Sequence, residues 1–200
     1  MIVIGLTGSI GMGKSTTARL FAEHGARLWC ADEAVHRLYA AGGTGAAAIA
    51  DLAPGAVSNG AVDRTALRAA ILADPALLPR IEAAVHPLVR ADRAAFLDAA
   101  RSEGAVVAVC DIPLLLETGD TADFDAIVVC SAPAPVQRDR VLARPGMTET
   151  AFEAIIARQM PDADKRARAD YIVDTGGGIG LAREQVAGIL SDLRERGGDA

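Results

Sequence analysis

The stretch that decides the fold is Gly8-Ser9-Ile10-Gly11-Met12-Gly13-Lys14-Ser15, close to the amino terminus. It matches the pattern G-x-x-x-x-G-K-[ST], in which glycines let the backbone wrap a phosphate chain with its N–H groups directed inward. The apolar run at 2–7 predicts a buried strand, and residues 16–24 predict a helix whose positive end faces the same anion. The order strand, loop, helix therefore predicts a site for a nucleoside triphosphate.

Five short apolar runs alternate with longer helical patterns along the chain. Three of these runs lack the polar alternation of a half-exposed strand, so we expect strands that are buried on both faces. Such strands form parallel sheets with helices on either side. The sequence thus predicts an α/β fold of the P-loop NTPase type, with a doubly wound five-stranded parallel sheet made by residues 2–7, 26–30, 105–110, 125–130 and 171–174.

The connection between the second and third runs is too long for one crossover helix. Residues 31–104 carry three or four helical patterns, so we expect a helical insertion over the carboxyl edge of the sheet, where α/β proteins bind their ligands. We expect a single domain over residues 1–200, with its core at about 1–30 and 105–200.

Several residues predict where helices begin. Asp63 is expected to cap the helix that follows it, and Thr150, with Glu153 three residues later, is expected to cap a helix that ends near residue 160. The pair His86-Pro87 is expected to open a helix that reaches residue 100, because proline favours the first helical position.

Composition limits the classes of function. A formal net charge of −6 and a pI near 5.1 offer no basic face for nucleic acid, and no stretch is long enough to span a membrane. The three cysteines do not have the spacing of metal ligands, and each ends an apolar run. We expect them to be free thiols, which are typical of a reducing compartment. We therefore expect a cytoplasmic protein without nucleic-acid or membrane partners. The oligomeric state is not fixed, although the sequence favours a monomer.

Polar side chains end the strands at the carboxyl edge. Lys14 can reach the β and γ phosphates of a nucleotide, and Ser15 can ligate Mg²⁺. Asp32, after the second strand, could orient or deprotonate an attacking hydroxyl, or could cap the helix that starts at Glu33. Asp111, at the end of the third strand, could serve the metal, or could cap a turn.

Arg140 and Arg144 lie four residues apart, which predicts that they share one helix face. Pro145-Gly146 then ends the helix. Arginines beside such a hinge suit a lid, at about residues 138–150, that closes on phosphates and excludes water. The alternative is a solvated helix in which Asp139 pairs with its neighbours.

Six ordered elements that cover nearly the whole chain resemble the dephospho-coenzyme A kinase family. They are the loop at 5–15, Cys30-Ala31-Asp32, His86-Pro87, Ile112-Pro113-Leu114-Leu115-Leu116-Glu117, the set Gln137, Arg140 and Arg144, and the set Gln159, Lys165 and 169–175. Cys30 stands where the family has a first aspartate, and Thr175 stands where it has an asparagine near the expected adenine site.

The resemblance implies transfer of the ATP γ-phosphate to the ribose 3′-hydroxyl of dephospho-coenzyme A, with Mg²⁺ as cofactor. It implies catalytic roles for Asp32, Lys14 and Arg140, and a metal site at Ser15 and Asp111. The acceptor would contact Asp32, Arg64 and His86. The residues expected to contact ATP are Gly8, Gly11, Met12, Gly13, Lys14, Ser15, Thr16, Arg140, Arg144 and Thr175. Alternatives are another P-loop small-molecule kinase, such as one for nucleoside monophosphates, and a nucleotide-binding regulatory protein.

Overall fold

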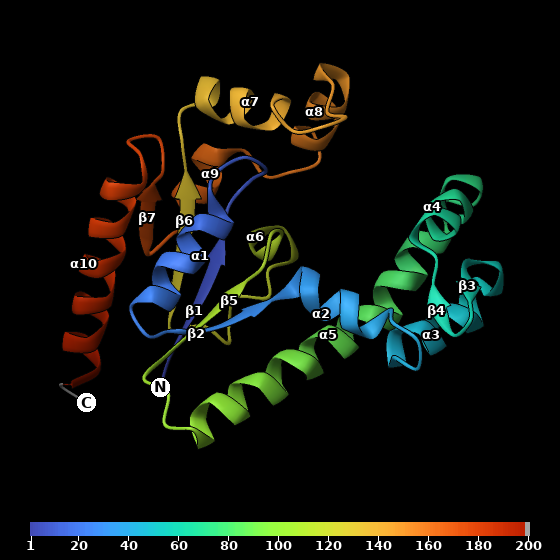
Figure 1. The fold of residues 1–200 in the computed structure, drawn as a ribbon, viewed down its shortest axis with the longest axis horizontal. Helices are drawn as coiled ribbons and strands as arrows, with labels where there is room; N and C mark the ends of the chain where they lie inside the picture. The colour runs from blue at the N-terminus through green and yellow to red at the C-terminus, as the bar shows by residue number, and fades with distance from the viewer. Residues whose placement is uncertain (199–200) are drawn as a thin grey trace. The chain divides into compact units, whose positions relative to one another are not determined.

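A computed structural model describes residues 1–198 of the chain, which divide into two compact units (Figure 1). The core unit comprises residues 1–28 and the chain from residue 100 onward, and the inserted unit comprises Trp29–Ala99. The elements, in chain order, are β1 (Ile2–Thr7), α1 (Lys14–Glu23), β2 (Arg27–Cys30), α2 (Ala31–Leu38), α3 (Thr44–Leu52), the 3-10 turn η1 (Pro54–Ala56), β3 (Val57–Ser58), β4 (Ala61–Val62), α4 (Arg64–Ala73), α5 (Leu77–Ser102), β5 (Val107–Asp111), α6 (Leu115–Thr118), β6 (Ala126–Ser131), α7 (Ala134–Leu142), α8 (Glu149–Ile156), α9 (Asp162–Arg166), β7 (Tyr171–Asp174) and α10 (Ile179–Gly198).

The five-stranded sheet has the order β2-β5-β1-β6-β7, which confirms the predicted α/β class. β1 is central and pairs in parallel with β5 and β6, and β6 pairs in parallel with β7. Five of the six residues of β1 are apolar or glycine, and every residue from Val3 to Thr7 is buried, as the unbroken apolar run predicted. The parallel direction places the carboxyl ends of β1, β5 and β6 at one edge, where the loop after β1 begins.

Helices cover both faces of the sheet, so the predicted doubly wound arrangement is confirmed. On one face, Phe21 of α1 and Val186 of α10 join the apolar cluster of β1 and β6, and both are fully buried. On the other face, Leu115 of α6 packs with Ile127 and Val129 of β6. Figure 1 shows α7 and α8 across the end of the sheet from which the loop after β1 emerges. These two helices therefore stand over the loop.

The inserted unit has an apolar core of its own. Ile49 of α3, Leu67 of α4, and Leu77, Ile81 and Val85 of α5 form this cluster. The prediction that Asp63 caps α4 is confirmed, because one of its carboxylate oxygens accepts the N–H groups of Thr65 and Ala66. The unit also contains a short antiparallel hairpin, β3–β4, which the helical patterns of residues 31–104 did not predict.

The helix expected to open at Pro87 instead begins at Leu77, so that prediction is wrong. Pro87 lies inside α5 and removes one N–H donor from its ladder. The helix continues through it because buried apolar residues recur at helical spacing on both sides of the proline, and each is at most 6% exposed; they are Leu77, Ile81 and Val85 before it and Leu97 and Ala100 after it. Burial of this stripe outweighs the cost of one lost hydrogen bond.

The predicted capping box at Thr150 is also wrong. Thr148 caps α8, and its hydroxyl accepts the N–H of Ala151. The preceding turn leaves Thr148 with the extended backbone that a cap requires, so Glu149 already starts the helix and Thr150 lies within it. α8 ends at Ile156 rather than near residue 160.

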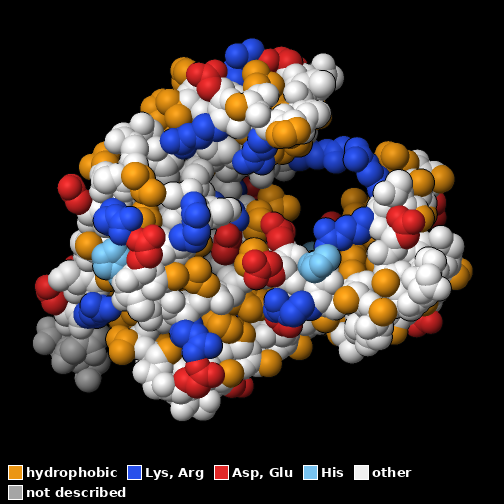
Figure 2. All heavy atoms as spheres, in the orientation of Figure 1, with side chains coloured by type: hydrophobic (Ala, Val, Ile, Leu, Met, Phe, Trp, Pro, Cys, Tyr) orange, Lys and Arg blue, Asp and Glu red, His pale blue; other side chains and the backbone are white. Residues whose placement is uncertain are grey.

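The surface is mixed in charge. On the face drawn in Figure 2, acidic and basic side chains are interspersed. Exposed ion pairs join Arg183 to Glu23, between α10 and α1, and Arg27 to Glu103. Within residues 1–198, none of the helices combines the length and apolar character that a membrane crossing needs.

Candidate active site

The loop between β1 and α1 has the backbone that its glycines predict. Gly11 and Gly13 both have a φ of 78°, a left-handed value that favours glycine. Gly13 directly precedes Lys14, the first residue of α1. Within residues 1–198, the N–H groups of Gly11, Gly13, Lys14 and Ser15 donate to no protein acceptor. Four free donors at the positive end of a ten-residue helix make a site for an anion.

Three other predicted loop residues play a different part. Met12 is 2% exposed, its sulfur accepts the N–H of Ala132, and its own N–H bonds the carbonyl of Ser9. The N–H of Thr16 bonds the carbonyl of Gly13, and the added methyl of an alanine at Gly8 would lie 2.8 Å from a carbonyl oxygen of β6. These contacts hold the loop against the sheet rather than offering donors to a ligand.

Lys14 and Asp111 form an ion pair at the carboxyl edge of β1 and β5. Their side chains are 14% and 10% exposed, so little water screens the pair. The sequence placed both residues at this edge, and the structure brings them together. Ser15, in the first turn of α1, is exposed.

A buried thiol lies close to this pair. Cys130 is completely buried at the end of β6, and this burial raises the pKa of its thiol to about 12. Thr17 and Lys14 oppose this rise in pKa through a hydrogen bond and a positive charge, and the negative charge of Asp111 adds to it. Cys130 is therefore a neutral packing residue beneath the loop at physiological pH.

α7 packs directly against the phosphate loop. A methyl added at Gly11 would stand 2.6 Å from Cγ2 of Val141 and 2.9 Å from the carbonyl oxygen of Gln137. Val141 is fully buried and Gln137 is 7% exposed. The middle of α7, within the predicted lid, is therefore part of the packed core unit. By contrast, none of the residues of α8 is buried.

Arg140 of α7 is held at the loop by Thr175. Its guanidinium donates to the hydroxyl of Thr175 at 2.9 Å and to the carbonyl of Thr175 at 2.7 Å. The hydroxyl of Thr175 in turn lies 3.1 Å from the carbonyl oxygen of Met12. Thr175 is 7% exposed and lies against Gly13, where an added methyl would be 3.0 Å away. Thr175 thus connects the loop, the chain after β7 and Arg140.

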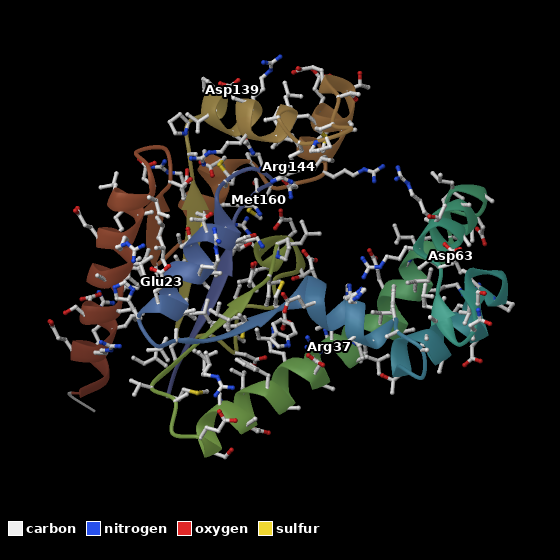
Figure 3. All side chains as sticks on the ribbon, in the orientation of Figure 1. Glu23, Arg37, Asp63, Asp139, Arg144 and Met160 are labelled. Carbon is white, nitrogen blue, oxygen red and sulfur yellow. The ribbon has the colours of Figure 1, made fainter. Side chains whose placement is uncertain are left out.

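Arg144 does not share the helix face of Arg140, so that prediction is wrong. α7 ends at Leu142, and Arg144 lies exposed in the turn before Pro145. The residue before a proline is disfavoured in helical conformation, which accounts for the early end. Figure 3 shows Arg144 beneath α7 and Asp139 on the opposite, outer side. Arg138, not Arg140, is the residue of α7 that pairs with Glu149.

The structure adds a buried pair that the sequence left unassigned. Lys165 is fully buried and its ammonium lies 2.9 Å from a carboxylate oxygen of Glu117. The ammonium also lies 3.4 Å from the carbonyl of Pro113, which accepts the hydroxyl of Thr7 as well. This network joins α9 and α6 to the last residue of β1. Both residues lie in the elements that resemble the kinase family, but nothing in the sequence indicated that they pair.

The predicted acceptor residues Asp32, Arg64 and His86 all belong to the inserted unit, and all are exposed. Asp32 lies in the first turn of α2, whose N-cap is Cys30, so the capping alternative for Asp32 is wrong. The guanidinium of Arg64 lies 5.9 Å from the ring centroid of Tyr39. Partial burial raises the pKa of Tyr39, and Arg64 opposes that rise.

The strand order, together with an anion site at the start of the helix after the central strand, defines an α/β nucleotide-binding protein of the phosphate-loop class. The family described as CoaE, dephospho-CoA kinase, matches residues 2–180. The chain belongs to this family.

Known relatives agree over nearly the full chain. The dephospho-CoA kinase of Mesorhizobium japonicum is 55% identical over 198 residues, which cover 99% of this chain and 100% of the relative. That of Cereibacter sphaeroides is 57% identical over 192 residues, which cover 96% and 95%. The crystal structure of TT1252 from Thermus thermophilus is 33% identical, with a TM-score of 0.81 and coverage of 96% of this chain and 97% of that one.

Proposed function

We propose that this protein transfers the γ-phosphate of ATP to the ribose 3′-hydroxyl of dephospho-coenzyme A and releases coenzyme A and ADP. The observation that carries the proposal is the set of four free N–H groups around Lys14, in a chain that belongs to the dephospho-CoA kinase family. A loop of this kind supports nucleotide binding, and the family supports the choice of acceptor.

The core unit binds ATP in this proposal. The N–H groups of Gly11, Gly13, Lys14 and Ser15 donate to the phosphate oxygens, and the positive end of α1 favours the same charge. Lys14 is paired with Asp111 in the structure, and the phosphates give its ammonium a second anionic partner. A compact ammonium on a flexible stem can serve both partners, whereas a planar guanidinium cannot take its place.

Ser15 and Asp111 would hold Mg²⁺. They offer one hydroxyl and one carboxylate, hard oxygen donors of the kind Mg²⁺ takes together with water and substrate phosphates. When bound, the metal would neutralise charge on the phosphates. Asp111 is fixed at the end of β5, and Ser15 is fixed by the first turn of α1.

Arg140 would neutralise charge on the transferring phosphoryl group. Phosphoryl transfer depends on positioning and on electrostatic stabilisation, so a guanidinium held in place has little rotational freedom to lose. The two hydrogen bonds to Thr175 supply that positioning. Thr175 would support ATP binding indirectly, through its contacts with Arg140 and the loop. The exposed Arg144 would contact the phosphates from the turn after α7.

The inserted unit would bind the acceptor. Asp32 is an exposed carboxylate free of any capping bond, so it is available to accept a hydrogen bond from the 3′-hydroxyl and to take its proton. Arg64 and His86 would contact the acceptor's phosphates. We also propose a monomer that works in the cytoplasm, without nucleic-acid or membrane partners.

Product analysis tests the proposal. The protein is incubated with Mg-ATP and, in parallel, with dephospho-coenzyme A, a nucleoside monophosphate or shikimate. ADP and coenzyme A in equal amounts, with dephospho-coenzyme A alone, are the expected result. A higher turnover with another acceptor would assign another kinase activity, and no turnover despite tight ATP binding would favour the regulatory alternative.

Two substitutions assign the roles. Lys14→Ala should lower kcat by about 100-fold to 1,000-fold with the fold intact, as loss of a charge-stabilising donor does. Asp32→Asn should lower kcat by at least about 100-fold and leave ATP affinity unchanged. Arg183→Met is the control, because it removes an exposed cation of the core unit that also contains Lys14, and it should retain full activity. An unchanged kcat in Asp32→Asn would exclude a catalytic role for that carboxylate.

A further inference from the structure

Two glutamine side chains hold the main chain on both sides of Ile10, one residue of the phosphate loop. The N–H of Ile10 donates to Oε1 of Gln159 at 3.0 Å. The carbonyl of Ile10 accepts Nε2 of Gln137 at 2.8 Å. Gln137 lies on α7, and Gln159 follows α8. Both polar groups of one loop residue are therefore engaged by the segment that lies over the loop.

The direction of each bond is fixed by its main-chain partner. An N–H can only donate and a carbonyl can only accept, so Gln159 must present its oxygen and Gln137 must present its amide nitrogen. Gln137 is 7% exposed and partly shielded from competing water, and Gln159 is partly buried. Each contact lies within the range of a well-formed hydrogen bond.

Ile10 directly precedes the residues whose N–H groups face the anion site. The carbonyl of Ile10, which Gln137 binds, and the N–H of Gly11 belong to one planar peptide group, so a rotation of this group would turn that N–H. The bond of Gln159 to the N–H of Ile10 holds the peptide group before it. The close packing of Gly11 on Val141 and on the carbonyl of Gln137 sets the position of α7 against the same peptide. The bond from Gln137 thus fixes the orientation of the loop from the helix that carries Arg140, and the bond from Gln159 does so from the chain after α8.

We propose that Gln137 and Gln159 are positioning residues that pre-organise the phosphate loop for ATP. A loop that is ordered before binding loses less entropy when the ligand arrives. Without the bonds, only a fraction of the free protein would have the binding conformation, and the apparent affinity would fall by that fraction. The inference rests on the proposed function only in taking ATP as the ligand.

Nearly isosteric substitutions test the proposal, with ATP binding measured by isothermal titration calorimetry in the absence of acceptor. Gln137→Met and Gln159→Met should each weaken ATP binding about 5-fold, as expected for the loss of one hydrogen bond worth about 1 kcal/mol. In steady-state assays, KM for ATP should rise by the same factor while KM for dephospho-coenzyme A stays unchanged. A purely structural role would lower the unfolding midpoint without this selective effect on ATP.

A glutamate at each position distinguishes the two bonds. At pH 8.5, Gln159→Glu keeps an acceptor for the N–H of Ile10, whereas Gln137→Glu places a carboxylate oxygen against the carbonyl of Ile10. Both variants add one negative charge to the same region. Gln159→Glu should therefore bind ATP better than Gln137→Glu by at least about 5-fold, the equivalent of a hydrogen bond restored.

Arg138→Met is the matched control, because Arg138 lies on α7 and pairs with Glu149 rather than with the loop. It should bind ATP as the unmodified protein does. Unchanged ATP affinity in both methionine variants, or equal affinity in the two glutamate variants, would overturn the proposal. If the unmodified protein fails to phosphorylate dephospho-coenzyme A but the methionine variants still bind ATP more weakly, the proposed function fails and this inference stands.

Discussion

Gly11→Ala tests how tightly the phosphate loop and α7 are joined. The first cost is conformational, because Gly11 has a φ of 78° and an alanine there loses roughly 1–2 kcal/mol. The second cost is steric, since the added methyl would lie 2.6 Å from Cγ2 of Val141 and 2.9 Å from the carbonyl oxygen of Gln137. Overpacking of this kind costs about 1–3 kcal/mol. The free energy of unfolding of the core unit should therefore fall by about 2–5 kcal/mol.

Gly25→Ala is the matched control. Gly25 belongs to the same unit and has a φ of 86°, yet an added methyl there would meet no atom within 4 Å. This variant pays the conformational cost alone, about 1–2 kcal/mol. Thermal unfolding followed by circular dichroism should place the midpoint of Gly11→Ala below that of Gly25→Ala by about 2–12 °C. Gly11→Ala should also lose ATP affinity, while Gly25→Ala should keep it. Equal midpoints and equal affinities would refute the claim that α7 is packed tightly on the loop.

Three further perturbations act on other parts of the molecule. Lys165→Met should lower the free energy of unfolding by about 3–5 kcal/mol in urea titrations, because it leaves Glu117 without its buried partner. A double variant that also carries Glu117→Leu should recover most of this loss, and its failure to do so would contradict the pairing. Asp63→Ala should lower the midpoint of the inserted unit, followed by the fluorescence of Trp29, by the equivalent of about 1 kcal/mol; no change would mean that the cap of α4 contributes nothing. The raised pKa of Cys130 predicts that the free energy of unfolding falls between pH 9 and pH 12, by at most about 1.4 kcal/mol per pH unit, because the unfolded state releases the thiol proton at a lower pH than the folded state does. Cys130→Ala should reduce this dependence on pH. An identical dependence in the variant would exclude the thiol as its source.

The sheet could be predicted from the sequence because strands that are buried on both faces appear as unbroken apolar runs. The run at 2–7 coincides with β1, and 171–174 coincides with β7. The loop and Asp111 could be predicted to lie at one edge because parallel strands end there, whereas the ion pair between Asp111 and Lys14 is shown by the structure alone. The hairpin β3–β4 was not predicted, although the sequence contained a signal for it. Asn59-Gly60 is a favoured two-residue turn, and both residues have a positive φ in the structure.

Other features depend on contacts that no local pattern records. The continuation of α5 through Pro87 is decided by a buried stripe in the inserted unit. The bonds of Gln137 and Gln159 to Ile10 join residues 127 and 149 positions apart. Family resemblance marks these glutamines as shared residues, and only the fold shows which atoms they hold.

The placement of the two lysines has a practical consequence for chemical labelling. The sequence contains only Lys14 and Lys165, and Lys165 is enclosed on all sides. A reagent that acylates amines should therefore react with the folded chain at two sites, the amino terminus and Lys14 in the phosphate loop. Peptide mass mapping can assign the label to each of them, and loss of the Lys14 adduct when nucleotide is added would give a covalent record of occupancy, obtained without any engineered tag.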